Sequence, residues 1–147
     1  MRGFPQDMDK ALKMFHKAGE LGYAGAYNNI GATYDFGEEG VKMNQKKAEY
    51  YYELAAMMGN AVARNNLGNF ERIWKGNTDR ALKHYMIAVK SGNSRSLEEI
   101  KRLYTKGQAT KDDYMKALQL YQAYLGEIKS KQRDEAAAAN EEKCRYY

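Results

Sequence analysis

One repeated pattern constrains the fold of this chain more than any other feature. It consists of alanine, an aromatic residue, alanine and glycine, spaced by four, three and four residues, and it occurs three times. The three copies are Ala11, Phe15, Ala18 and Gly22; Ala48, Tyr52, Ala55 and Gly59; and Ala81, Tyr85, Ala88 and Gly92. A fourth, weaker copy begins at Ala117. The first alanines recur every 33 to 37 residues, which is a period of helix-turn-helix repeats.

Residues at these spacings lie on the same face of a helix. Alanine on that face lets two helix backbones approach, and the aromatic ring fills the space beside them, so we expect the face to pack against a neighbouring helix. Glycine at the last position of the pattern fits a left-handed C-cap that turns the chain. Each copy therefore predicts one buried helix followed by a tight turn.

A second helix is predicted after each turn, because a small residue is followed four places later by a branched apolar one. These pairs are Ala26 and Ile30, Ala63 and Leu67, and Ser96 and Ile100. Glycine comes next at Gly31 and Gly68, but Lys101 takes that place in the third copy. We expect helices over residues 8–20, 24–36, 45–57, 61–74, 78–90, 94–106 and 111–128. The expected N-caps, four places before each first alanine, are Asp7, Asn44, Asn77 and Asp113.

The length and charge of the chain bear on its domain number and on the kind of partner that it could bind. The 147 residues suffice for one domain, and the net charge of +5 with a pI near 9.1 allows a polyanionic partner. Lysine and arginine are scattered among acidic residues at helical spacing, which indicates solvated helix faces more than a nucleic-acid site. Binding to RNA or acidic membranes stays the alternative, and it would weaken steeply with salt.

The chain contains no signal-peptide pattern and no apolar run of about 18 residues. We therefore expect a cytoplasmic protein, although an incomplete N-terminus would hide a leader.

No catalytic, metal or cofactor site is predicted. His16 and His84 are the only histidines and lie on separate predicted helices, and Cys144 is the only cysteine. Neighbouring acidic residues such as Glu98 and Glu99 diverge by about 100° on a helix instead of converging on one bond. No P-loop, dinucleotide-binding, G-x-S-x-G or H-E-x-x-H motif occurs. We therefore expect no enzyme, and a hydrolase is the least favoured alternative. The tyrosines that we expect in the core are Tyr34, Tyr52, Tyr85, Tyr104 and Tyr121.

The pattern resembles the Sel-one-like repeat, a relative of the tetratricopeptide repeat. The unit that is most similar contains Ala26, Ile30, Gly31, Tyr34, Gly37, Gly40, Val41, Lys47, Ala48, Tyr51, Tyr52, Ala55, Ala56 and Gly59. A second unit matches through Ala63, Leu67, Gly68, Ala81, Tyr85, Ala88 and Gly92, and a third is degenerate. The resemblance covers about residues 7–125. Two departures are the loop from Gly37 to Val41, which is one residue longer than in the family, and Lys101, which would hold its helices further apart.

The resemblance implies an all-α fold, a right-handed α-α superhelix (solenoid) of about three helix-turn-helix repeats. The solenoid is expected over residues 1–128, with an orphan N-terminal helix at 8–20 and repeats at about 24–59, 61–92 and 94–128. Residues 129–147 are expected to form a polar C-terminal capping helix or tail. The orphan helix would expose Leu12 and Phe15, so we infer that the chain is a piece of a longer repeat array or pairs through that end.

The resemblance also implies a protein–protein interaction scaffold or adaptor. Relatives act as adaptors in endoplasmic-reticulum-associated degradation, as activators of chitin synthase and as bacterial signalling or secretion factors. A few bacterial relatives have been proposed to act on beta-lactams, but those are rich in paired cysteines and this chain has one cysteine.

In similar superhelices the first helix of each repeat lines a concave groove, where a partner peptide or domain binds. The corresponding positions here are Asn28, Asp35, Phe36, Asn65, Asn69, Arg72, Arg95, Glu98, Arg102 and Lys106. Asparagine amides would pair with a peptide backbone, and Arg95, Arg102 and Lys106 would attract acidic side chains or a terminal carboxylate. The other interpretation of these positions is that they are polar only to keep exposed helix faces soluble.

Overall fold

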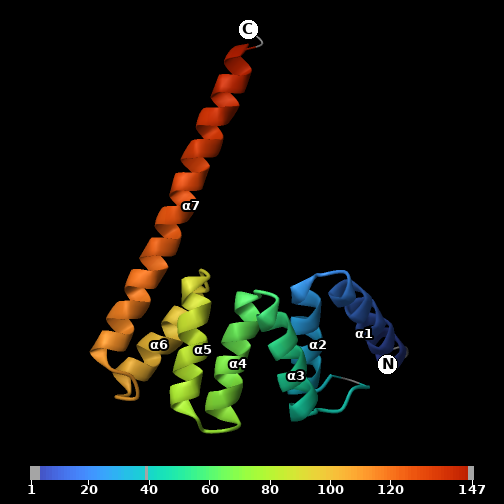
Figure 1. Cartoon of the computed structure of the whole chain (residues 1–147). Helices are drawn as coiled ribbons and strands as arrows, with labels where there is room; N and C mark the ends of the chain where they lie inside the picture. The colour runs from blue at the N-terminus through green and yellow to red at the C-terminus, as the bar shows by residue number, and fades with distance from the viewer. Residues whose placement is uncertain (1–3, 39, 146–147) are drawn as a thin grey trace.

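The computed structural model describes residues 4–38 and 40–145. This part of the chain contains seven helices, most of them joined by short turns, and its only strand-like pairing is a single bridge between Glu38 and Val41 (Figure 1). The helices are α1 (Phe4–Glu20), α2 (Ala24–Phe36), α3 (Gln45–Met57), α4 (Ala61–Ile73), α5 (Thr78–Lys90), α6 (Ser94–Thr105) and α7 (Lys111–Arg145). The all-α solenoid expected from the repeat is confirmed.

Asparagine caps start four of the helices. The side chains of Asn44, Asn60, Asn77 and Asn93 each accept a hydrogen bond from the backbone N–H three residues later, at 2.8 to 3.1 Å. These contacts satisfy backbone donors that a helix N-terminus leaves free. The predicted caps Asn44 and Asn77 are therefore confirmed.

Two predicted caps are wrong. Helix α1 begins at Phe4, so Asp7 lies inside its first turn. At α7 the cap is Thr110, whose hydroxyl accepts from the N–H of Asp113 at 3.0 Å, while the Asp113 carboxylate accepts from the N–H of Thr110 at 2.9 Å. Asp113 is thus the third residue of a reciprocal capping box and not the cap itself.

Buried tyrosines join the two helices of each of the first two hairpins. Tyr52 of α3 and Tyr85 of α5 are fully buried, and they press against glycines on α2 and α4. A Cβ atom added at Gly31 would lie 2.6 Å from the Tyr52 ring, and one added at Gly68 would lie 2.4 Å from the Tyr85 ring. Since such distances are too short for any side chain, glycine is required at both crossings.

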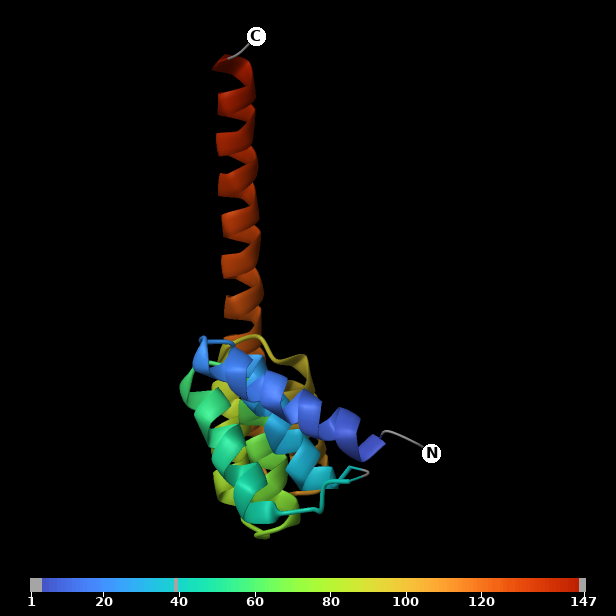
Figure 2. The same ribbon diagram turned by 90° about the vertical axis from the view of Figure 1, so that its right-hand side faces the viewer.

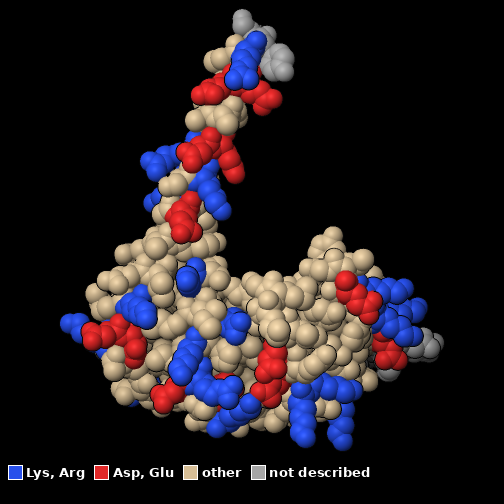
Figure 3. Space-filling model, in the orientation of Figure 1, with Lys and Arg blue, Asp and Glu red and all other residues tan. Residues whose placement is uncertain are grey.

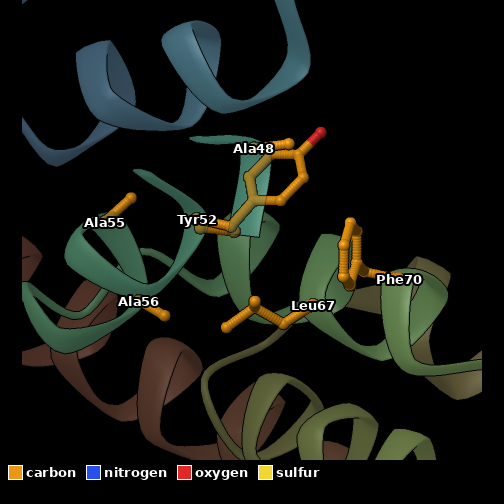
Figure 4. Close-up of a cluster of buried hydrophobic side chains, with 7 residues drawn as sticks. Ala48, Tyr52, Ala55, Ala56, Leu67 and Phe70 are labelled. Atoms are coloured by element: carbon orange, nitrogen blue, oxygen red, sulfur yellow. The ribbon is translucent and has the colours of Figure 1, made fainter. Parts of the chain in front are cut away.

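The alanines of the repeat lie where the pattern places them. Ala48 and Ala55 are fully buried in the cluster around Tyr52, which also contains Leu67 and Phe70 of α4 (Figure 4). The glycines that end α1, α3 and α5 have φ angles between 91° and 100°, in the left-handed region that the predicted turns require.

The third hairpin packs differently. Lys101 stands where the first two repeats have glycine, it is exposed, and α6 packs less closely against α7 than α2 does against α3. Tyr104, expected in the core, is 37% exposed and stacks on Tyr114 with ring centres 5.5 Å apart. Tyr34, which occupies the corresponding position of the first repeat, stacks on Tyr51 of α3. The residue of α7 that corresponds to Tyr51 is Leu120. Tyr104 therefore stacks on Tyr114, near the start of α7, because no ring is present at position 120.

Helix α7 differs from the prediction that it ends near residue 128. It continues to Arg145 without a break and projects from the body of the solenoid (Figures 1 and 2). Ile128 stands where Gly22, Gly59 and Gly92 turn the chain after the preceding helices. The residues that follow are rich in alanine, glutamate, lysine and arginine, which favour helix.

Deleting residues 129–147 is expected to change the free energy of unfolding by less than about 0.5 kcal/mol. The reason is that the side chains of residues 129–145 are all exposed, so the deletion removes no packing from the solenoid. Urea denaturation of the full and shortened chains measures the difference. A loss above about 1 kcal/mol would show that the extension stabilises the solenoid and contradict a boundary near residue 128.

Candidate protein-binding surface

Side-chain contacts join α2, α4 and α6 into one continuous surface. The Asn66 amide of α4 donates to the Asn28 side-chain oxygen of α2 at 2.9 Å, and the Trp74 indole N–H donates to Asp35 at 3.2 Å. Helix α4 reaches α6 through the ion pair between Arg72 and Glu99, at 3.8 Å. The helices that were predicted to carry the groove therefore lie next to one another in chain order.

Asn65 is not part of this surface, which corrects one predicted groove residue. It is 5% exposed, and its side-chain oxygen accepts a hydrogen bond from the Ser96 hydroxyl at 2.7 Å. Ser96 occupies the small-residue position that is alanine in the first two repeats, and its fully buried hydroxyl needs a partner. Asn65 supplies that partner, so it joins α4 to α6 inside the solenoid.

The buried tyrosines orient two of the predicted surface residues. The Tyr52 hydroxyl donates to a carboxylate oxygen of Asp35 at 3.1 Å, and the Tyr85 hydroxyl donates to the side-chain oxygen of Asn69 at 2.7 Å. Burial raises the pKa of Tyr52, and the negative charge of Asp35 raises that pKa further. Burial also raises the pKa of Tyr85. Both hydroxyls therefore stay protonated at neutral pH and fix the side chains that they hold.

A hollow of about 230 Å³ lies between the C-terminal ends of α2 and α4. The residues that line it are Asp35, Phe36, Asn66, Asn69, Phe70, Ile73 and Trp74. Phe36 is 78% exposed and Trp74 is 44% exposed, so aromatic surface is open to solvent at its rim. Asp35, Phe36 and Asn69 were predicted surface residues, and the structure brings them together.

Sequence reasoning missed Trp74, Ile73 and Asn66 at this hollow. One signal was present for Trp74, because it is the only tryptophan and it stands where the first repeat has Gly37. A large ring at the end of α4, in place of the glycine that ends α2, adds a wall that the preceding repeat does not have.

The α6 end of the surface is basic but partly neutralised. Glu99 accepts from Arg102 at 3.0 Å and pairs with Arg72, which also donates to the Tyr85 hydroxyl at 3.4 Å. Arg95 and Lys106 are exposed, as is the predicted residue Glu98, and none of these three has an ion pair among the described residues. Acidic and basic side chains are interspersed on the visible face, as Figure 3 shows.

The residues considered for chemistry lie apart. The His84 ring is half-buried against Arg64, with 3.5 Å between Nδ1 and the guanidinium, whereas the His16 ring meets the edge of Tyr51. Burial, and then the charge of Arg64, lower the pKa of His84, so its ring is neutral at physiological pH. In the described part of the chain no three His, Cys, Asp or Glu side chains converge as a metal site would require. None of the described helices combines the length and the apolarity needed to cross a membrane.

The Sel1 repeat family model matches residues 1–23, 24–60 and 102–123, which together make up more than half of the chain. The chain belongs to the Sel1 repeat family. The matched range 24–60 coincides with the hairpin of α2 and α3, which carries the most complete copy of the pattern. Residues 61–101, which include the unusual Trp74, lie outside the match.

This Sel1 repeat chain is similar to parts of three larger proteins. Chitin synthase regulatory factor 4 of Schizosaccharomyces pombe is 28% identical over an aligned length of 132 residues, covering 65% of this chain and 21% of that protein. A Sel1 repeat protein from Oxalobacter formigenes has a crystal structure similar to this one, with a TM-score of 0.65, 27% identity, and coverage of 78% of this chain and 49% of that one.

A protective antigen of uropathogenic Escherichia coli with the same repeat fold gives a TM-score of 0.64 and 25% identity, over 80% of this chain and 27% of that one. This chain thus spans half or less of each of these proteins. Sel1 repeat proteins are generally protein-interaction scaffolds, and the family is typically non-enzymatic.

Proposed function

We propose that this Sel1 repeat chain is an interaction scaffold that holds an extended segment of a partner protein along the concave surface of α2, α4 and α6. The observation that carries the proposal is the set of polar side chains on this surface that buried groups already hold in place, above all Asp35 and Asn69. A preorganised surface loses less conformational entropy when a partner binds. The name of the S. pombe relative, a chitin synthase regulatory factor, fits a role in which such repeats act on another protein.

The asparagines of the surface have free hydrogen-bonding groups for a peptide backbone. The side-chain oxygens of Asn28 and Asn69 are engaged by Asn66 and Tyr85, which leaves both amide nitrogens as donors. At the α6 end, Arg95, Arg102 and Lys106 supply charged donors for acidic side chains or a terminal carboxylate of the partner. The proposed role requires no catalytic step, cofactor or metal ion. We propose that the protein performs it in the cytoplasm.

Replacing Arg95 and Arg102 together by glutamate is expected to weaken the binding of acidic peptides about 30-fold or more, which corresponds to about 2 kcal/mol. The peptides are selected on the unmodified chain from a random displayed library, and their affinity is then measured by fluorescence polarisation. The fold is expected to survive the change, because both residues are exposed and Arg72 still pairs with Glu99.

The matched control replaces Lys83 and Lys101, two exposed lysines of α5 and α6 outside the proposed surface, by glutamate. This control changes the net charge by the same amount and is expected to change the affinity less than about 3-fold at 0.15 M salt. Equal affinity of the unmodified chain and the arginine variant would remove the α6 end from the binding surface. Steep weakening of RNA or acidic-vesicle binding with salt, without peptide selection, would favour the polyanion alternative.

A further inference from the structure

We infer that the hollow between α2 and α4 holds a lysine or arginine side chain of the bound partner segment. This inference rests on the proposed function and assigns one position of the partner. It is carried by the walls of the hollow, by the charge at Asp35, and by the pairing of the basic residues of the protein that lie around it.

Three aromatic side chains line the hollow. Phe36 and Trp74 are both exposed, and the buried Phe70 is the third aromatic residue of the lining. A cation over such rings is attracted by the negative charge of the ring face, and tryptophan gives the strongest attraction. The methylene stem of a lysine or arginine side chain also packs well on an apolar surface while its charged end stays in contact with water or polar groups.

Asp35 gives the hollow a negative charge that no described basic side chain pairs with. The two carboxylate oxygens of Asp35 accept hydrogen bonds from the Tyr52 hydroxyl and the Trp74 indole, which are both neutral donors. A carboxylate has about four acceptor positions, so further positions stay available for a charged donor. None of the described lysines, arginines or histidines forms an ion pair with Asp35.

Two basic residues of the protein close to the hollow pair with carboxylates other than Asp35. Lys75 follows Trp74 in the chain; its ammonium group binds Glu49 and Glu71 and lies over the Phe70 ring, 5.8 Å from the ring centre, but it forms no ion pair with Asp35. Arg72 pairs with Glu99 and donates to Tyr85. No basic side chain in the described part of the chain therefore neutralises Asp35.

These facts discriminate between possible occupants of the hollow. A neutral apolar side chain would cover the Asp35 carboxylate without pairing it, which costs free energy, and an acidic side chain would be repelled. A guanidinium or ammonium group would pair with Asp35, and the Asn66 side-chain oxygen is a further acceptor because only its amide nitrogen is used by Asn28. The partner would thus place a basic residue at α2 and α4 and acidic groups towards α6, which fixes its direction on the surface.

The only tryptophan of the chain reports on the hollow directly. The indole N–H resonance of Trp74 is followed by NMR while the protein is titrated with acetyl-Gly-X-Gly-amide, where X is arginine, norleucine or glutamate. We expect a saturable shift with arginine and at least 10-fold weaker binding of norleucine and glutamate. A norleucine affinity equal to that of arginine would overturn the inference.

Two variants separate binding from folding. Asp35→Asn is expected to weaken the arginine probe at least 10-fold, and Phe36→Ala is expected to weaken it several-fold. Phe36 is the more robust variant, since its ring is mostly exposed and removing it leaves the core intact. Thermal melting establishes that each variant is folded. Unchanged arginine binding by folded Asp35→Asn would overturn the inference, and for an unfolded Asp35→Asn the same outcome in Phe36→Ala would do so.

The outcomes also distinguish this inference from the proposed function. Peptides selected on the chain that bind through Arg95 and Arg102, but show no lysine or arginine preference and bind Asp35→Asn equally, would overturn the inference about the hollow alone. A chain that selects no peptide, yet whose Trp74 signal shifts specifically with the arginine probe, would contradict the proposed function and support a cation site.

Discussion

Replacing Tyr85 by alanine is expected to lower the free energy of unfolding by about 3–5 kcal/mol. The Tyr85 ring is fully buried between α4 and α5, packs directly on the backbone at Gly68, and its hydroxyl is held by Asn69. The substitution leaves a cavity at the centre of the second hairpin, which the surrounding helices can only partly close. Urea denaturation followed by circular dichroism measures the loss.

Tyr85→Phe is the matched control, because it keeps the ring and removes only the hydroxyl. It is expected to cost about 1 kcal/mol, since Asn69 is partly exposed and can exchange its lost partner for water. Equal losses in the two variants would mean that the hydrogen bond, and not the packing of the ring, carries the stabilisation. A loss below about 1 kcal/mol for Tyr85→Ala would contradict the buried-tyrosine account altogether.

Gly68→Ala is expected to lower the free energy of unfolding by about 1–3 kcal/mol, although alanine is the better helix former. The added methyl group would meet the Tyr85 ring at 2.4 Å, so α4 and α5 must separate or the ring must leave its place. The same denaturation experiment measures this effect. It tests the close approach of the two helices without removing any atom from the core.

The control for this substitution is Gly126→Ala on α7, where an added Cβ atom has no neighbour within 4 Å. There the change is expected to raise the free energy of unfolding by up to about 1 kcal/mol, because glycine lowers helix stability when nothing requires it. Stabilisation at both glycines would contradict the packing of Gly68 against Tyr85.

Much of the fold could be predicted because the signals that set it are local. The asparagine cap, the face of alanine and tyrosine, and the glycine turn all lie within about four helical turns of each other, so the expected bounds 45–57 and 78–90 agree with α3 and α5. Where one local signal is missing, the prediction fails. Ile128 in place of glycine lets α7 continue to Arg145, and the polar sequence beyond it gives no apolar face from which its packing could be inferred.

The candidate surface was harder to predict, because which residues of a helix face outward depends on all its neighbours. Asn65 and Asn66 are adjacent, yet the first is buried against Ser96 of α6 while the second bonds to Asn28 of α2. Only the relative placement of three helices decides between them. The contact between Trp74 and Asp35, 39 residues apart, likewise depends on how the first two repeats stack. The groove positions implied by the resemblance lie on α2, α4 and α6, but the resemblance could not supply these contacts.

We propose above all that the joined surface of α2, α4 and α6 holds a partner segment. Hydrogen–deuterium exchange of the full chain, with and without a saturating peptide selected from the displayed library, tests it most directly. We expect slower exchange in α4, in α6 and in the C-terminal half of α2, with exchange in the exposed part of α7 unchanged. Slower exchange confined to α1 or to residues 129–145, with none in α4 and α6, would contradict the claim.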